Sequence, residues 1–575
     1  MSTEQETTDL ELLRRFEPVL RLNSDERFLP AAVDRYVAAC SMRQHTKDGT
    51  QILVPAGALT VDMLAEAEAG RPDVFIQFVS EEDRRQRHRV VLRGENHGLA
   101  RLARVGFLGR FFDVFFRLSL VLRATVPAGV TPAAAWKARR IGMHNEPVYY
   151  GRVVRDGGWT VLHYQYFYAM NDWRSTFGGV NDHEADWEQV MVYVEETEGG
   201  AIPHWVAYSN HDHAGDDLRR AWDDDELERF GNHPIVYVGG GSHAGYFRKG
   251  EYVTRVEAKA IDGIKRFSAW YRRLLHIAPP PGGFGIPYID HAEGDGVVIG
   301  PGGQYEWSPR LLDPWTPWVA DFRGLWGLDT TDRTGGERAP TGPRFNRDGT
   351  IRQSWVDPVG YAGLQKVVPP SMADEVRLQR LAALDREAES LHAEFEAARM
   401  RLRAEVLVGS TGPQAIAASE LHLARLRRAD SELRAERRRL EVGRQVPMGH
   451  RAHLHRPPTP DVRTDPGLRG KLLNLWVLVS VPVVFGLAAV AARIGNGFGI
   501  WAIVAVVGLS ALEAFLRRRF LHFLWATFAS VVLLGAVGVT VYFAVHDWRW
   551  TLLGVFGAAG IAVLVSNLWE RFRRE

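Results

Sequence analysis

Alternating hydrophobic and polar positions characterise much of the first 370 residues of this chain. Between residues 147 and 303 the alternation has a period of two and is interrupted by Gly, Asn and Asp, which is typical of short strands joined by turns. We expect strands at residues 148–153, 160–168, 189–194, 204–209, 234–238, 252–256 and 296–299. An earlier alternation at residues 16–22 predicts another short strand, followed by a helix near Val33. The pattern predicts a mainly β domain over residues 1–370, with an antiparallel, sandwich-like core.

The end of this domain has a different composition. Residues 307–364 are rich in Trp, Pro and Gly, which predicts a long ordered segment with little regular structure.

A heptad pattern follows the β-rich region. Its hydrophobic positions alternate in steps of three and four, at Leu381, Leu384, Ala388, Leu391, Phe395, Ala398 and Leu402. A Gly/Pro break at 409–413 separates this run from a second one. The pattern predicts an α-helical coiled-coil hairpin over residues 371–443. The same seam would also suit pairing between two copies of the chain, so a homo-oligomer is the alternative.

Four apolar segments follow a basic, Pro-rich linker at residues 444–471. They cover residues 472–492, 499–516, 520–545 and 551–568, and each is near the ~20 residues that cross a hydrocarbon layer. We therefore predict a four-helix transmembrane region over residues 472–575. The chain would be an integral membrane protein, in a bacterial plasma membrane.

The basic residues beside these segments predict their orientation. Arg and Lys gather at alternate segment ends, at 469–471, 517–519 and 571–574. By the positive-inside rule, both termini face the cytoplasm. Residues 1–13 show no pattern of a cleaved export signal. Glu513 is the only acid within a predicted span, and we expect it to reach the interface by snorkelling.

Residues 106–126 form a further apolar stretch. Arg110, Asp113, Arg117 and Arg123 interrupt it, so it is too charged to span a bilayer easily. It would be either a helix buried against the core or an interfacial helix on a membrane.

Charge and cysteine content exclude some function classes. The chain has 70 basic and 69 acidic residues, for a formal net charge of +1, so we predict no nucleic-acid partner. Its one cysteine, Cys40, excludes a disulfide within the chain and a Cys-based zinc site.

An acidic loop between two predicted strands is the candidate functional centre. It reads His183-Glu184-Ala185-Asp186-Trp187-Glu188. One imidazole and three carboxylates this close together are costly unless they are solvated, hydrogen-bonded or shared by a cation. In an extended segment, Asp186 and Glu188 point to one side and Trp187 to the other.

Two more histidines follow predicted strands, and they extend the candidate site. If the loops converge, His183, Asp186, Glu188, His211 and His243 offer nitrogen and oxygen ligands for a divalent ion such as Ca, Mg, Mn or Zn. No organic cofactor is predicted. The alternative is that each histidine hydrogen-bonds a loop backbone and the acids cap turns.

A serine-based site is a further alternative. Residues 240–244, Gly-Gly-Ser-His-Ala, are similar to a nucleophile elbow in which Ala replaces the last Gly. A helix should follow such an elbow, but residues 245–251 are a poor helix start. The run of glycines also lacks the Lys-Ser/Thr of a phosphate-binding loop, which indicates a tight turn. No catalytic residue is therefore assigned.

Several motifs, in order, resemble the vacuolar protein sorting-associated protein sixty-two family over residues 14–345. They are Phe-Glu-Pro-Val-Leu at 16–20, Tyr-Gln-Tyr-Phe-Tyr at 164–168, the acidic loop at 183–188, Pro-Ile-Val-Tyr at 234–237, Ser-His-Ala at 242–244, Gly-Asp-Gly-Val-Val at 294–298 and Pro-Thr-Gly-Pro at 340–343. Members of this family typically have Gly where Ala185 stands. The family's name reflects an association with trafficking.

The acidic loop also looks like the His-Asp-Trp-Glu signature of the necrosis-inducing cytolysins. Those proteins are β-sandwiches that bind a divalent cation and a glycosylated membrane lipid. This resemblance implies that His183, Asp186 and Glu188 are cation-site residues.

These patterns lead to one main hypothesis for function. It is a membrane-anchored, cytoplasm-facing β domain that binds a divalent cation and a polar ligand, either a lipid head group or a glycan. One alternative is a metal-dependent hydrolase in which Glu188 or His183 activates water. The other is a coiled-coil membrane scaffold in which the loop is only structural.

Overall fold

A computed structural model describes residues 3–66, 73–87, 110, 126–173, 181–210, 214–256, 286–330, 338–408, 413–441, 467–494, 498–546 and 549. His211, the fourth predicted span and most of residues 106–126 lie outside the described residues. The chain divides into two compact units. The first comprises residues 1–96, 120–254 and 289–460, and the second comprises residues 97–119, 255–288 and 461–575.

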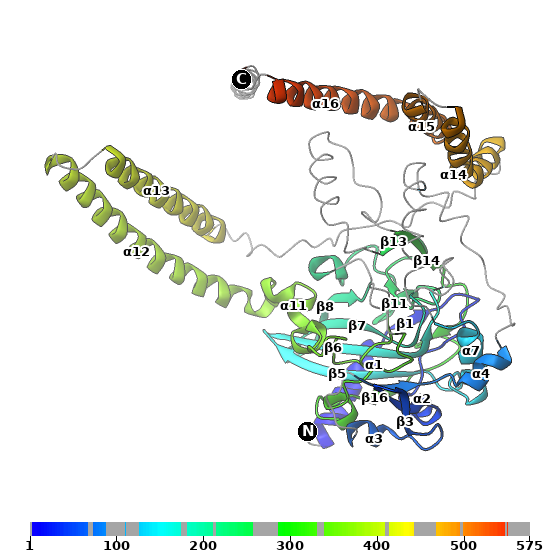
Figure 1. Ribbon diagram of the computed structural model, residues 1–575. Coiled ribbons are helices and arrows are strands. Elements are labelled where there is room, and N and C mark those ends of the chain that lie inside the picture. Colours follow the sequence, from blue (N-terminus) through cyan, green and yellow to red (C-terminus); the bar gives the residue numbers. More distant parts are fainter. Residues whose placement is uncertain are drawn as a thin grey trace. The chain divides into compact units, whose positions relative to one another are not determined.

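The first unit contains a six-stranded sheet (Figure 1). Its order is β16-β5-β6-β7-β8-β9, formed by Ser308–Leu311, Val148–Asp156, Trp159–Asn171, His183–Thr197, Gly200–Tyr208 and Arg219–Ala221. Neighbouring strands are antiparallel except β16 and β5, which are parallel. The strands predicted in this region are confirmed, and β6 and β7 extend beyond their predicted ends.

The second large sheet mixes parallel and antiparallel pairs. Its order is β10-β11-β1-β15, formed by Arg229–Phe230, His233–Val238, Val19–Arg21 and Val298–Ile299, and β12 (Gly245–Tyr246) also pairs with β11. The pair of β1 and β11 is parallel. The prediction of a mainly β domain is therefore confirmed, but its sheets are mixed where an antiparallel core was expected. Hydrophobic alternation indicates which residues form strands, but it does not indicate which strands pair. It therefore could not predict that β1 pairs with β11.

Smaller sheets and helices complete the β-rich part. β3 (Gly49–Val54), β2 (Ser41–Thr46) and β4 (Val74–Gln77) form a three-stranded sheet, and β13 (Gly250–Val256) pairs with β14 (Ile286–Ala292). The helices are α1 (Thr3–Phe16), α2 (Val33–Ala39), α3 (Val61–Glu66), α4 (Glu81–Arg87) and α7 (Val130–Arg140), together with the 3-10 turn η1 (Gly215–Leu218). α2 confirms the helix predicted near Val33.

One hydrophobic core joins the two large sheets. It contains Leu162 and Tyr164 of β6 together with Leu20 of β1 and Val236 of β11. A second cluster, which includes Val359 and Leu364, covers residues of β6, β7 and β8. In its described residues, the chain from 307 to 372 forms short elements: β16, α9 (Pro317–Ala320), α10 (Gln353–Val356), α11 (Pro358–Tyr361), η3 (Leu364–Lys366) and η4 (Pro370–Met372). The prediction of an ordered segment with little regular structure is confirmed.

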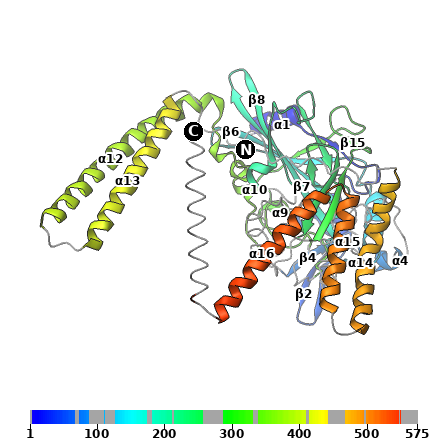
Figure 2. The same ribbon diagram turned by 90° about the horizontal axis from the view of Figure 1, so that it is seen from above.

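The heptad region forms two long helices, α12 (Ala373–Val408) and α13 (Pro413–Glu441). They lie side by side in both views (Figures 1 and 2). Contacts at the two ends of the pair show that the helices are antiparallel: Arg380 pairs with Glu436 at 2.8 Å, whereas the Ser419 hydroxyl donates to Glu405 at 3.0 Å. Leu384 of the predicted seam is buried. The helical hairpin is therefore present, whereas coiled-coil supercoiling and pairing between copies stay predictions.

The described residues of the second unit include three long apolar helices. They are α14 (Leu468–Ile494), α15 (Phe498–Leu516) and α16 (Phe520–His546), at the first three predicted spans. Over the described residues, no individual helix combines the length and the apolar character needed to cross a membrane. One pair, Leu468–Val477 with Val479–Gly486, passes that test together but is bent by 49°. The transmembrane bundle therefore stays a prediction.

Candidate functional site

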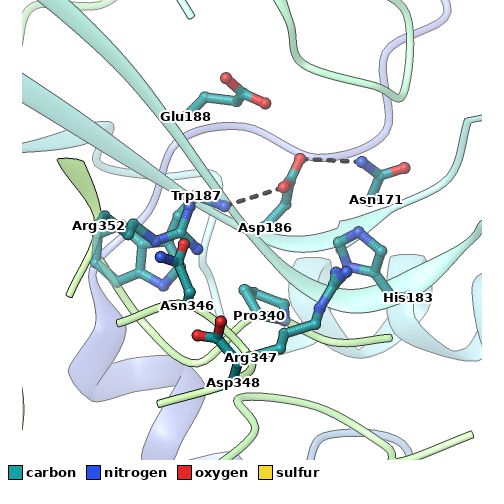
Figure 3. A pocket seen from close by; sticks show the side chains of 10 residues that line it. All are labelled: Asn171, His183, Asp186, Trp187, Glu188, Pro340, Asn346, Arg347, Asp348 and Arg352. Atoms are coloured by element: carbon teal, nitrogen blue, oxygen red, sulfur yellow. Dashed lines mark hydrogen bonds between the residues drawn. The ribbon is translucent and has the colours of Figure 1, made fainter. Parts of the chain in front are cut away.

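A cavity of about 450 Å³ lies where β6 ends and β7 begins (Figure 3). One side is formed by strand residues and the other by a loop that follows residue 339. The lining residues are Asn171, His183, Asp186, Trp187, Glu188, Pro340, Asn346, Arg347, Asp348 and Arg352. Residues 183–188 were predicted to form a loop, but they are the first residues of strand β7, where pairing with β6 holds them. His183, Asp186, Trp187 and Glu188 line the cavity.

Asp186 is held by three donors inside this site. Its Oδ2 accepts a hydrogen bond from Asn171 Nδ2 at 3.2 Å, and its Oδ1 accepts one from the backbone N–H of Trp187 at 3.0 Å (Figure 3). The third donor is His243, whose Nδ1 lies 2.8 Å from Oδ2. The structure therefore brings His243 to Asp186 at the start of β7, although the two residues are far apart in sequence.

The His243 ring is enclosed between carboxylates and an aromatic ring. Its side chain is 0% exposed, and it stacks on Tyr168 with a centroid distance of 3.8 Å. Its Nε2 lies 3.7 Å from Glu26 Oε1, within ion-pair range. Burial alone would lower the pKa of His243, but the hydrogen bond to Asp186 and the negative charge of Glu26 outweigh it and raise the pKa to about 10. The chain itself therefore supplies a positive charge, the His243 imidazolium, between Asp186 and Glu26.

Glu26 and Gly241 fix the loops around this imidazolium. The Glu26 carboxylate accepts hydrogen bonds from the backbone N–H groups of Arg27 at 2.7 Å and Gly241 at 2.9 Å. Gly241 has a φ of +73°, and a Cβ there would lie 2.1 Å from the carbonyl oxygen of Asp172. Only glycine fits this approach. Asp172 in turn forms an ion pair with Arg27.

Glu184 does not belong to the cavity, unlike Asp186 and Glu188. Its carboxylate is buried and accepts hydrogen bonds from the backbone N–H groups of Phe78, Val79 and Leu328 at 3.0, 2.8 and 2.9 Å. The next residue, Ala185, has a φ of +57°, a conformation that favours glycine. Glu184, which was not among the predicted site residues, therefore joins separate chain segments through its hydrogen bonds.

Glu188 and His183 lie on different sides of Asp186 (Figure 3). Glu188 accepts a hydrogen bond from the Ser209 hydroxyl. Burial, together with the charge of Asp186, raises the pKa of Glu188 to about 8. His183 Nδ1 donates to the carbonyl oxygen of Ala185 at 2.7 Å. For His183, the alternative of a histidine that hydrogen-bonds the loop backbone is thus observed.

Among the described residues, no group of three or more His, Cys, Asp or Glu side chains that could hold a metal ion is found. His183, Asp186, Glu188 and His243 are described and have the partners given above, whereas His211 lies outside the described residues. Binding of a divalent ion stays a prediction.

Arg352 is the site residue that sequence reasoning missed. Its Nε donates to the carbonyl oxygen of Phe345 at 3.0 Å, and its two terminal nitrogens make no hydrogen bond within the described part of the chain. Asn171 adds a buried acceptor, because its Oδ1 has no hydrogen-bond partner among the described residues. No sequence spacing connects residue 352 with residues 183–188. The Pro-Thr-Gly-Pro motif at 340–343 was the nearest signal.

The serine alternative loses its geometric basis. Ser242 is 0% exposed, and its hydroxyl donates to Asp290 Oδ2 at 2.7 Å. The two ring nitrogens of His243 face Asp186 and Glu26. The next element is the short strand β12, not the helix that an elbow requires. Ser242 is therefore a buried structural residue.

No family model matches the chain, and no curated protein or solved structure matches it either. The resemblance to the sorting-protein family depends on its motifs and stays a prediction.

Proposed function

We propose that this is a membrane-anchored protein whose β-rich unit binds a polar, anionic ligand in the cavity where β7 begins. The ligand would be a lipid head group or a glycan that carries a phosphate or carboxylate. The observation that carries this proposal is the guanidinium of Arg352, which lines the cavity while its terminal nitrogens make no hydrogen bond to described residues. Arginine pairs well with planar or tetrahedral anions because its donors form a fixed fork.

Two features reduce the negative charge that would repel such a ligand. Asp186 is paired with the His243 imidazolium, and Glu188 has a pKa raised to about 8, so much of it is protonated near neutral pH. Arg347 adds a positive charge to the lining and Asp348 a negative one, so Arg352 remains as the net positive charge. Asn171 Oδ1 would accept a hydrogen bond from a ligand hydroxyl. An anion that also carries hydroxyl groups therefore suits the lining.

The anchor in this proposal is the C-terminal helical region. Its support is the apolar sequence of α14, α15 and α16 together with basic residues at alternate segment ends, from which the positive-inside rule predicts cytoplasmic termini. A divalent cation would bind in the cavity together with the anionic ligand. Calorimetric titration of the ligand in EDTA and in added Ca, Mg, Mn or Zn tests whether a cation contributes to binding.

Isothermal titration of the full-length protein in a neutral detergent tests the ligand proposal. The probes are soluble glycerophosphate head groups and uronic-acid oligosaccharides, which distinguish the two sources of the anion. Arg352→Gln should weaken binding by about 10- to 100-fold, because a charge-assisted hydrogen bond is lost. Arg248→Gln is the control, since Arg248 pairs with Glu226 and does not line the cavity. Absence of binding by both probe classes, or equal binding by Arg352→Gln and the control, would overturn the proposal.

A metal-dependent hydrolase is the second candidate. It is favoured by Glu188, a cavity carboxylate whose raised pKa is typical of groups that transfer protons. Turnover of a phosphodiester or ester panel with added metal, abolished by Glu188→Gln, would support it. The scaffold alternative predicts instead that deleting residues 372–443 abolishes function while Asp186→Ala leaves function intact.

A further inference from the structure

A buried ion pair lies inside the second unit. Arg110 contacts the Glu513 carboxylate with both terminal nitrogens, and the Nη1 to Oε1 distance is 3.2 Å. The two side chains are 1% and 4% exposed. Glu513 belongs to α15, whereas Arg110 belongs to the segment 97–119, which interrupts the first unit in sequence.

Further hydrogen bonds satisfy the pair from two helices. From α14, the Ser480 hydroxyl accepts from Arg110 Nη2 at 3.1 Å and Trp476 Nε1 donates to Glu513 Oε2 at 3.1 Å. Directly after the end of α15, Arg517 Nε donates to Glu513 Oε1 at 2.7 Å. The expectation that Glu513 reaches the interface by snorkelling is therefore wrong, because its carboxylate is enclosed by partners from the chain.

The physical consequence follows from burial. Removing one member of a buried, hydrogen-bonded ion pair leaves the other charge without compensation in an apolar environment, which is strongly unfavourable. The cost is also high within a bilayer, where charged residues pair with one another. Substituting either Arg110 or Glu513 should therefore destabilise the helical unit, although neither residue lines the ligand cavity.

We infer that Arg110 is an assembly residue of the C-terminal helical unit. It joins α14 through Ser480 and α15 through Glu513. The helical unit is then not an independent C-terminal anchor, because a residue from the N-terminal half of the chain completes it. For Arg110, this role differs from both roles predicted for residues 106–126, which were a helix buried against the β core and an interfacial helix on a membrane. It does not depend on the proposed ligand.

Charge reversal in the full-length chain tests this inference. The readout is the amount of monodisperse protein recovered after detergent extraction and size-exclusion chromatography. Arg110→Glu and Glu513→Arg should each reduce recovery by about tenfold or more, because each places two like charges in one buried site. The double exchange should restore recovery to within about threefold of the wild type. Arg493→Glu, at an exposed position of α14, is the control and should recover like the wild type.

Neutral and conservative variants keep the test decisive if the reversals fail to fold. Arg110→Lys retains the charge and should be recovered in larger amounts than Arg110→Met, which retains the length but not the charge. Equal recovery of these two variants would overturn the inference. It would also be overturned if the single reversals behaved like Arg493→Glu, or if the double exchange recovered no better than the worse single reversal.

Discussion

Replacing His243 with Asn removes the imidazolium that lies between Asp186 and Glu26. Asn tolerates the positive φ of 57° at this position, so the substitution tests charge and ring contacts more than backbone strain. The Glu26 and Asp186 side chains, 2% and 10% exposed, then lose their shared cation. Breaking a buried ion pair by removing one partner costs about 3–5 kcal/mol, and we expect a loss of stability of that size.

Amide hydrogen exchange in the full-length protein measures this loss locally, over β6 and β7. A single unfolding free energy is not defined for a chain with two units, whereas exchange reports the opening of individual strands. His204→Asn is the matched control, because His204 lies 3.2 Å from Glu195 but is 24% exposed. It should cost less than about 1 kcal/mol. Equal protection of β6 and β7 in the two variants would refute the reasoning.

The stabilisation that His243 gives to the folded protein should decrease as the pH rises. The pKa of His243 in the folded protein, about 10, lies above its ordinary value of 6.5. The stabilisation by His243 is therefore fully present below pH 6.5 and is lost as the pH rises through about 10. Exchange protection of β6 and β7 should decrease over this interval in the wild type. His243→Asn should lack that component of the decrease.

Three further predictions concern the residues around the cavity. Gly241→Ala should lower the local free energy of opening, measured by amide hydrogen exchange, by at least about 2 kcal/mol more than Gly157→Ala, because both sites have positive φ but only a Cβ at 241 meets Asp172. By the same measurement, Glu184→Ala should cost at least about 3 kcal/mol, since three buried amides lose their acceptor, and Glu184→Gln should cost less; equal exchange protection in the two variants would contradict this. Affinity for a glycerophosphate probe should fall as the pH rises through about 8, where Glu188 ionises, and Glu188→Gln should remove that step. A pH profile unchanged in Glu188→Gln would exclude Glu188 as its cause.

Local patterns identified the strands and the hairpin because those features depend on nearby residues. The period of two located β5 to β8, and the heptads located α12 and α13. The parallel pairing of β1 with β11 could not be predicted, since Val19 and Ile235 are distant in sequence and alternation carries no information on partners. The same limit hid the pairing of Arg110 with Glu513.

The candidate site was predicted in part. The clustering of charge at residues 183–188 pointed to the right strand end, and His243 was among the expected residues. The role of His243 differs from the predicted one. The sequence suggested that His243 binds a divalent ion, whereas in the structure it forms a hydrogen bond with Asp186. The left-handed Ala185 turned Glu184 away from the cavity, which an extended pattern does not foresee. Arg352 could not be assigned, since only the tertiary fold brings it to β7.

The protonation state of the His243 ring is the central feature of the proposed site, and nitrogen-15 NMR of histidine-labelled full-length protein measures it directly. The signals of His243 are assigned by their loss in His243→Asn. At about pH 8, above the ordinary histidine pKa, both ring nitrogens should still carry protons, and EDTA should leave their chemical shifts unchanged. A neutral ring at that pH, or signals that move when EDTA removes a bound metal, would contradict the account.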